Sequence, residues 1–505
     1  MSDPSALNIP VSTALTSDML LGLKPSAPKS RSYRISIAPI NKSVFAPADQ
    51  IIFELPTGRK GTWLDQSQSY LKFSVQFAST NGSAAGSTGV YLDNTAYSFF
   101  QRCDIYHSSN LLETINEYGQ LANFLLDTSL TASDKAGLSP LIGSNADTIF
   151  ANLIAPAINT AIVPLRQAGD RSGQTFPSVN LGAPALISTG IPYTFCLPML
   201  SGVIGVNASK MLPVGKLASP LRVELYLSAN DDAIYYGTAA AGAVWQLINV
   251  EFCACYVEIQ DDSLDLISND ETQYISTTTY RQASTYLPAA TSGEFTTLLP
   301  FRAASITALY ARFRNYGSAT QGVNASAAYR KSSSINPNLS YFYFRIGSSL
   351  YPNKPIYLTN GSLVGTGAEA YGELLKSFHA LSSSIGNSAI NFQSYNVAAT
   401  ATQGFNQCYV PGAKTTAANT MSTAIDTHGN AFAIGLECQS FSNRNDTILS
   451  GISTLNSQIY FTGGIATGLV AGRADAPGPF NYTVDFFSQM DMVLILQHGI
   501  LTARF

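Results

Sequence analysis

The stretch YLKFSVQF at residues 70–77 alternates apolar and polar side chains along its whole length. In an extended chain Leu71, Phe73 and Val75 share one side, and the polar residues between them share the other. The stretch LRVELYL at residues 221–227 repeats this alternation. A period of two predicts β-strands that each bury one face, as in an antiparallel β-sandwich.

Shorter runs rich in β-branched and aromatic residues predict further strands on both sides of these two stretches. In the first half they are RISIAPI (34–40), IIFELP (51–56), RCDIYH (102–107), YTFCLPM (193–199) and VEFCACYVEI (250–259). After the acidic stretch DDSLDLISNDE (261–271) they are TQYISTTTY (272–280), TTLLPF (296–301), SITALYARF (305–313), YFYFRIG (341–347), AFAIGLECQSF (431–441), QIYFTGG (458–464) and MVLILQHGILTARF (492–505). The acidic stretch is therefore the expected boundary between two domains.

A repeated phrase links the two halves. NEYGQL stands at residues 116–121 and EAYGEL at residues 369–374, so that Tyr118 and Tyr371 lie 253 positions apart. Apolar residues recur at intervals of three and four around both phrases, which predicts amphipathic helices over residues 111–127 and 368–381. At the same offset Tyr118, Leu121, Ala122 and Leu125 correspond to Tyr371, Leu374, Leu375 and Phe378.

The order of elements predicts an all-β chain built twice. A chain of 505 residues exceeds one ordinary domain. Regular alternation of strands and helices is absent, so we expect antiparallel sandwiches rather than a parallel sheet. The expected parts are an N-terminal arm (1–31), a first module (32–262) and a second module (263–505).

Two long segments, residues 129–190 and 382–428, are rich in Ala, Ser, Thr, Gly, Asn and Pro. They far exceed the usual loop of about 4–6 residues. Disorder is one interpretation. We favour ordered projections or contacts with a neighbouring subunit, because apolar residues such as Ile149 and Phe150 are scattered through the first segment.

Composition argues against several classes of partner and compartment. Charged residues make up 12% of the chain, the net charge is −4, and no block of five like charges occurs, so sequence-specific binding of nucleic acid is not expected. The start of the chain does not resemble a signal peptide, and no run of 18 apolar residues exists. We therefore expect a protein that is made and kept inside the cell. Its six cysteines, Cys103, Cys196, Cys253, Cys255, Cys408 and Cys438, are then expected to be buried thiols rather than disulfides.

No motif predicts a catalytic, cofactor or metal site. The four histidines, His107, His379, His428 and His498, form no helical zinc pair, and Cys253-x-Cys255 lies in a strand pattern where core packing is the better interpretation. The serine-hydrolase elbow and the phosphate-binding loop are absent. The acidic doublets Asp231-Asp232 and Asp261-Asp262 are expected in loops. LVGTGAE (363–369) has the form of a viral maturation-protease site, but a turn at the helix entry is favoured. We expect no enzyme and no cofactor.

The stretches IIFELPTGRKGTWLDQSQSYLKFSVQF (51–77) and YFYFRIGSSLYPNKPI (341–356), with the two-fold plan, resemble the double jelly-roll major capsid proteins of DNA viruses. This lineage includes adenoviruses, tailless membrane-containing phages, virophages and polinton-like viruses, and the phrases look most similar to the last two. The resemblance implies two tandem antiparallel eight-stranded jelly rolls, each with a short helix and long loop insertions. It also implies homotrimeric, pseudo-hexagonal capsomers in an icosahedral shell that encloses a DNA genome.

The resemblance further implies where the protein acts and what it contacts. It would be assembled inside the host cell and lie in the virion capsid, where its partners are further copies of itself, penton proteins, and minor capsid or cement proteins. The arm would join neighbouring trimers or touch an inner membrane, and the two helices would brace their modules with Tyr118 and Tyr371 in equivalent settings. The alternative from the residues alone is a two-domain β-sandwich protein that binds carbohydrate or another ligand through its long loops. A glycosidase would require a buried carboxylate pair, which the sequence does not locate.

Overall fold

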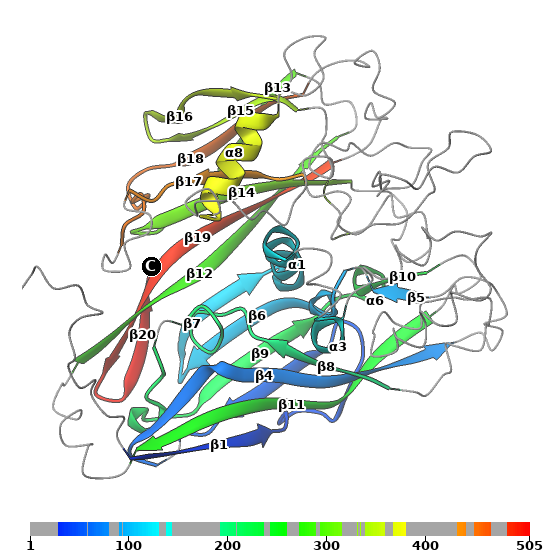
Figure 1. Cartoon of the computed structure of the whole chain (residues 1–505), viewed down its shortest axis with the longest axis vertical. Coiled ribbons are helices and arrows are strands. Elements are labelled where there is room, and N and C mark those ends of the chain that lie inside the picture. The colour runs from blue at the N-terminus through cyan, green and yellow to red at the C-terminus, as the bar shows by residue number, and fades with distance from the viewer. Residues whose placement is uncertain are drawn as a thin grey trace, which may run out of the picture.

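The computed structural model describes residues 29–57, 59–79, 90–92, 94–130, 138–143, 192–208, 210–236, 243–259, 272–288, 293–315, 331, 334, 339–358, 367–379, 432–440, 449–465 and 482–505. These residues form two β-sandwich modules, one drawn from strands before residue 260 and the other from strands after residue 271 (Figure 1). Within these ranges the chain has no helix that is both long and apolar enough to span a membrane. The expected loop segments 129–190 and 382–428 lie almost entirely outside the described residues.

The first module consists of two antiparallel sheets. One has the order β1-β11-β4-β8, with a short additional strand on β11. Its strands are β1 (Ser30–Ile37), β11 (Ala243–Ile259), β4 (Thr62–Ser79), β8 (Tyr193–Pro198) and the additional β2 (Val44–Phe45). The other sheet has the order β3-β9-β6-β7, from β3 (Gln50–Leu55), β9 (Leu221–Leu227), β6 (Phe100–His107) and β7 (Asn110–Asn116). A two-stranded ribbon pairs β5 (Val90–Leu92) with β10 (Ile234–Tyr236).

The second module repeats this plan. Its first sheet has the order β12-β19-β14-β17, with β20 also paired to β19. These strands are β12 (Thr272–Leu287), β19 (Tyr482–Gln497), β14 (Ile306–Asn315), β17 (Ile434–Glu437) and β20 (Ile500–Arg504). The second sheet has the order β13-β18-β15-β16, from β13 (Gly293–Leu299), β18 (Ile459–Ile465), β15 (Leu339–Ile346) and β16 (Ser349–Tyr357).

The two modules therefore have the same strand order, element for element. In each, the first strand pairs with the last long strand, and the four-strand paths of the two sheets together use eight strands, the arrangement of a jelly roll. The predicted all-β double jelly roll is confirmed. Strand β11 ends at Ile259 and β12 begins at Thr272. The acidic stretch between them lies outside the described residues, so the boundary at 262/263 remains a proposal.

Both predicted helices exist, but the first one begins later than predicted. Helix α1 spans Tyr118–Ser129 and helix α8 spans Ala368–Ser377. Residues 111–116 belong instead to β7, because a turn at Ser108 (φ 55°) folds this segment back onto β6. Glu117 then adopts the left-handed conformation (φ 49°), which separates strand from helix. The other helical turns among the described residues are short: η4 (Ala96–Phe99), α3 (Ser139–Ile142), η6 (Val214–Lys216) and α6 (Asn230–Ala233).

Apolar side chains of the alternating strands fill each sandwich. Leu71, Phe73 and Val75 are buried as the alternation predicts, and the Phe73 ring meets the edge of Phe100 at 5.3 Å. In the second module Phe461 occupies the centre, 5.2 Å from Phe486. Each such ring, when fully buried, contributes roughly 1.5–3 kcal/mol. The two cores are continuous with each other through the junction of the modules.

Candidate functional site

The junction between the modules holds several buried polar and charged groups, among them Glu113, Arg312 and Asp485. Helix α1 of the first module lies there, against the second module (Figure 1). It packs on the outer face of sheet β12-β19-β14-β17, which we call the second outer face. The described side chains of that face at the junction are Tyr280, Tyr310, Arg312, Asp485 and Phe487.

A glycine allows α1 to lie close to its own module. A Cβ atom on Gly119 would come 2.3 Å from the carbonyl oxygen of Tyr97 and 2.8 Å from that of Phe100. One residue earlier, the Tyr118 hydroxyl accepts a 2.7 Å hydrogen bond from the Leu200 backbone N–H, and burial raises its pKa well above the ordinary range. The start of the helix is thus held by backbone contacts on two sides.

Tyr118 and Tyr371 do not have equivalent settings, contrary to the prediction. Tyr118 is 1% exposed and hydrogen-bonded, whereas Tyr371 is only partly buried against the core. The equivalence holds one turn later, because Leu121 and Leu374 are both fully buried. Tyr118 is more deeply buried than Tyr371 because α1 lies between the two modules.

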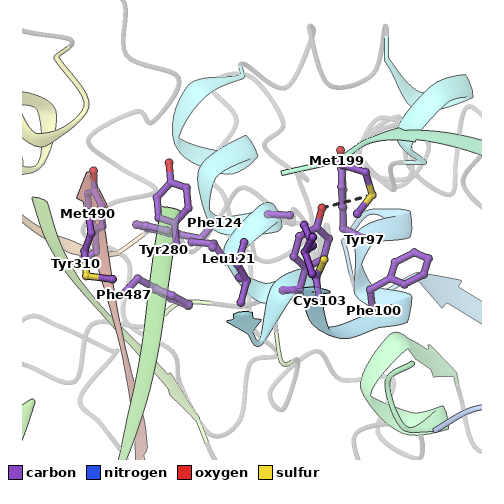
Figure 2. Close-up of a cluster of buried hydrophobic side chains, with 14 of the residues drawn as sticks. Tyr97, Phe100, Cys103, Leu121, Phe124, Met199, Tyr280, Tyr310, Phe487 and Met490 are labelled. Carbon is purple, nitrogen blue, oxygen red and sulfur yellow. Dashed lines mark hydrogen bonds between the residues drawn. The ribbon is translucent and has the colours of Figure 1, made fainter. Parts of the chain in front are cut away.

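The outward side of α1 carries an aromatic ring into the second module. Phe124 stacks on Phe487 with ring centroids 5.9 Å apart and an interplanar angle of 13°. It also meets the edge of Tyr310 at 5.6 Å and lies 5.9 Å from Phe378, at the end of α8. Figure 2 shows Phe124 directed to this side of the helix, with Cys103 and Tyr97 on the other. Such aromatic pairs contribute about 0.5–1.5 kcal/mol each beyond their burial.

A buried charge cluster lies beside this ring stack. The Arg314 Nε donates to Asp485 at 2.6 Å, and Arg312 lies 3.5 Å from the same carboxylate. Burial alone would raise the pKa of Asp485, but the two guanidinium groups hold it below its ordinary value. Arg312 also donates to the Gln120 side-chain oxygen of α1 at 2.7 Å. Both modules therefore supply partners to one buried cation, and removing a single partner costs more than the pair stabilises.

Two further ionic contacts continue across the junction. The Lys331 ammonium lies 2.9 Å from both Glu117, which precedes α1, and Asp232 of α6.

The Glu113 carboxylate of β7 is fully buried and accepts hydrogen bonds from the hydroxyls of Ser201 and Thr279 and from the Gly202 N–H. Burial raises the pKa of Glu113, and these hydrogen bonds offset part of the effect. Because Thr279 belongs to β12, this carboxylate also joins the two modules.

At the other end of the junction His107 binds the last strand of the second module. Its Nδ1 accepts a hydrogen bond from the Leu501 N–H at 3.1 Å, and its Nε2 lies 3.1 Å from the Ser219 hydroxyl. This arrangement requires a neutral imidazole, since Nδ1 has no proton when it accepts. Burial lowers the pKa of His107, which favours that neutral form.

The other residues considered from the sequence lie apart from one another. Cys253 and Cys255 are buried in β11 as free thiols, 3.8 and 3.6 Å from serine hydroxyls of β1. His379 lies 3.7 Å from Glu437, and His498 lies in the turn between β19 and β20. His428 and the doublet Asp261-Asp262 lie outside the described residues, and so does most of LVGTGAE, of which Gly367 is the N-cap of α8. In the described part of the chain, no three His, Cys, Asp or Glu side chains gather as a metal site would require.

Sequence reasoning missed the junction residues. Arg312 stands within a predicted strand and Glu113 within a predicted amphipathic helix, where a charged residue is costly unless it is paired, whereas Asp485 lies outside the predicted elements. A charged residue among apolar neighbours was the available signal. It identifies a buried charge without identifying its partner, because the partners lie 166–192 residues away along the chain.

Comparison with known proteins agrees with the fold of two β-sandwich modules. No protein-family model matches the sequence, and neither does any curated protein. Solved structures do match, and they place the chain in the double jelly-roll fold of viral major capsid proteins. The PBCV-1 virus capsid model is 9% identical and has a TM-score of 0.53, with 96% of this chain and 99% of that chain covered.

Two virophage structures give the same result. The cryo-EM structure of the Sputnik virophage matches with 11% identity and a TM-score of 0.54, covering 97% of this chain and 92% of that chain. The crystal structure of the mavirus major capsid protein matches with 12% identity and a TM-score of 0.50, covering 100% of this chain and 95% of that chain. At these identities the similarity defines the fold, and it does so across both modules.

Proposed function

We propose that this chain is the major capsid protein of a DNA virus. The observation that carries the proposal is the match of the whole two-module chain to capsid structures, rather than of one sandwich alone. The junction supports a structural role, since its buried groups join two modules and form no arrangement typical of catalysis. We accordingly propose that the protein is not an enzyme.

The working unit is a homotrimer with a pseudo-hexagonal outline. Three chains of two like modules place six similar blocks around a three-fold axis. Interfaces within such a permanent trimer are large, about 2,000 Å² or more. Contacts between trimers can be individually weak, because many of them act together in a closed shell.

The remaining parts of the proposal concern the shell. Trimers assemble inside the host cell into an icosahedral capsid around a DNA genome, with penton and minor capsid or cement proteins as further partners. The arm at residues 1–31 joins neighbouring trimers or contacts an inner membrane. The charge-poor composition suits close packing of many copies.

Light scattering after size-exclusion chromatography tests the trimer. The purified protein is expected to elute as one species of three times the chain mass of 53.8 kDa. Electron micrographs of that species should show particles with a hexagonal outline. A monomer at micromolar concentration would contradict the proposal and favour a two-domain binding protein instead.

A further inference from the structure

The outward side of sheet β13-β18-β15-β16 carries several tyrosines. In β15 and β18 the side chains of Phe342, Phe344 and Phe461 are buried in the core, so the residues that alternate with them lie on the outward side. The strand register brings these outward residues together, and we call their surface the tyrosine face: Glu294, Tyr341, Tyr343, Arg345, Tyr357 and Tyr460. The sheet lies at the end of the molecule remote from the first module (Figure 1).

The counterpart of this face in the first module has different chemistry. On the outward side of sheet β3-β9-β6-β7, Arg102 lies 2.6 Å from Asp104, and Arg222 lies 2.5 Å from Glu224. Both faces have the same place in the fold, yet one carries paired charges and the other carries tyrosines. The tyrosines are therefore not a requirement of the jelly roll itself.

The ring of Tyr341 forms a fixed platform on this face. A Cβ atom on Gly464 would come 2.3 Å from the Tyr341 Cε1, 2.7 Å from its Cζ and 2.8 Å from its Cδ1, so the ring lies flat against the backbone of β18. The Tyr341 hydroxyl donates a 2.6 Å hydrogen bond to the Glu294 carboxylate on β13. This bond raises the pKa of Tyr341 to about 12, so the hydroxyl keeps its proton at neutral pH. The ring is thus held across three strands.

A second ring extends the platform, and polar groups border it. Tyr357 lies on the adjacent β16, with its ring centroid 5.9 Å from that of Tyr341, and it is 57% exposed. Tyr343 follows Tyr341 on the same side of β15, about 7 Å along the strand. Among the described residues, the hydroxyls of Tyr343 and Tyr357 have no hydrogen-bond partner. Two ring faces and two hydroxyl groups are therefore available to a ligand.

These groups match a pyranose sugar, which has C–H groups on its flat faces and hydroxyls around its rim. Ligand sites commonly combine aromatic faces with a few placed polar groups. We propose that the tyrosine face binds a neutral oligosaccharide, with one sugar ring stacked on Tyr341 and Tyr357 and the next sugar beside Tyr343. The second oxygen of the Glu294 carboxylate accepts a hydrogen bond from a hydroxyl of the first sugar.

Charge and side-chain type favour this occupant over an anion or another protein. The charged group bonded to the platform is a carboxylate, which repels phosphate and sulfate. Arg345 lies four residues along β15 from Tyr341, about 14 Å away, where it covers the ring of Tyr460 at 4.5 Å. Permanent protein interfaces have cores that are about 65% apolar. Here the exposed aliphatic residue Leu298 lies at the Arg345 end, and the neighbours of the platform include glycine and hydroxyl groups.

Calorimetry with cellohexaose, chitohexaose and mannohexaose tests the site. At least one of the three should bind to the full chain with a dissociation constant of about 1 mM or lower. Tyr341→Ala and Tyr357→Ala should each weaken that binding by about tenfold. Gly464→Ala should weaken it as well although both rings remain, because its Cβ atom displaces the platform. Tyr226→Ala is the matched control and should bind as the parent protein does, since Tyr226 lies on the counterpart face, 4.0 Å from Arg102.

Saturation-transfer NMR locates the contact. The ring C–H protons of the bound sugar should receive saturation from aromatic protons of the parent protein and much less from those of Tyr357→Ala, a change at an exposed side chain that leaves the core intact. Absence of binding by all three hexasaccharides at about 10 mM, or equal binding by the parent protein and Tyr357→Ala, would overturn the proposal. Binding of dextran sulfate alone would indicate an anion site and overturn it too. Because the contributing residues all belong to one module, these results do not depend on the trimer and are separate from the test of the capsid proposal.

Discussion

Gly119 and Gly372 occupy the same position of the repeated phrase, yet their surroundings differ. A Cβ atom on Gly119 would meet two backbone carbonyls, whereas one on Gly372 would have nothing within 4 Å. We expect Gly119→Ala to destabilise the protein by roughly 1–3 kcal/mol through overpacking. Gly372→Ala should instead stabilise it by about 0.5–1 kcal/mol, because alanine favours the helix. Urea denaturation followed by circular dichroism compares the two, and equal shifts would contradict the placement of α1.

Also at the scale of single residues, His107 makes the junction sensitive to acid. Its folded-state pKa lies below the ordinary value, so the unfolded chain binds the proton first as pH falls through about 6.5. Stability is therefore complete above that pH and declines below it, down to the folded pKa. His107→Asn can keep an acceptor for the Leu501 N–H but does not titrate there. We expect a flatter dependence of the denaturation midpoint between pH 5 and 7.5. His498→Asn, in the exposed β19–β20 turn, serves as control and should follow the parent protein.

Among the elements, α1 decides whether the modules unfold together. Phe124→Ala removes a ring that contacts three others in the second module, at a cost of roughly 3–5 kcal/mol. We expect calorimetry to show a lower midpoint and two separated transitions. Phe461→Ala, within the second core, should lower the midpoint while keeping one transition. A single transition in both variants would show that the modules are coupled elsewhere.

The same helix shows what the sequence could and could not predict at this scale. Its existence, its apolar side and its counterpart α8 follow from the three-to-four spacing. Its start does not, because Leu111 and Ile115 fit a helical spacing by coincidence while β7 pairs with β6. Local periodicity cannot distinguish a helix from a strand where pairing with a neighbouring strand of a hairpin determines the structure. The left-handed Glu117, which marks the true start, has no clear signal in its residue type.

For the whole molecule, the duplication was predictable and the junction was not. Alternating strands such as residues 70–77 and the repeated phrase predict two similar sandwiches. The contacts between them join residues far apart in sequence, such as Glu113 with Thr279 and Gln120 with Arg312. No short-range pattern records such pairs, although buried charges in apolar runs indicate that partners exist.

The proposed shell gives a prediction at the same scale for the arm. Deleting residues 1–28 should leave the trimer intact, because the described strands of both modules all lie after this segment. Shell formation should fail or give fewer closed particles, as the arm is proposed to join trimers. Light scattering and electron microscopy of the two proteins measure each step. Loss of the trimer itself would count against this division of roles.

The bond from the Leu501 N–H to His107 spans 394 positions of the chain. During synthesis a ribosome makes β6 long before it makes β20. The first module therefore lacks this hydrogen bond until the end of the second module has been synthesised. A product that stops short of β20 leaves the His107 imidazole without this donor. Such a product would also lack the pairing of β20 with β19, so completion of the first module depends on the last residues of the chain.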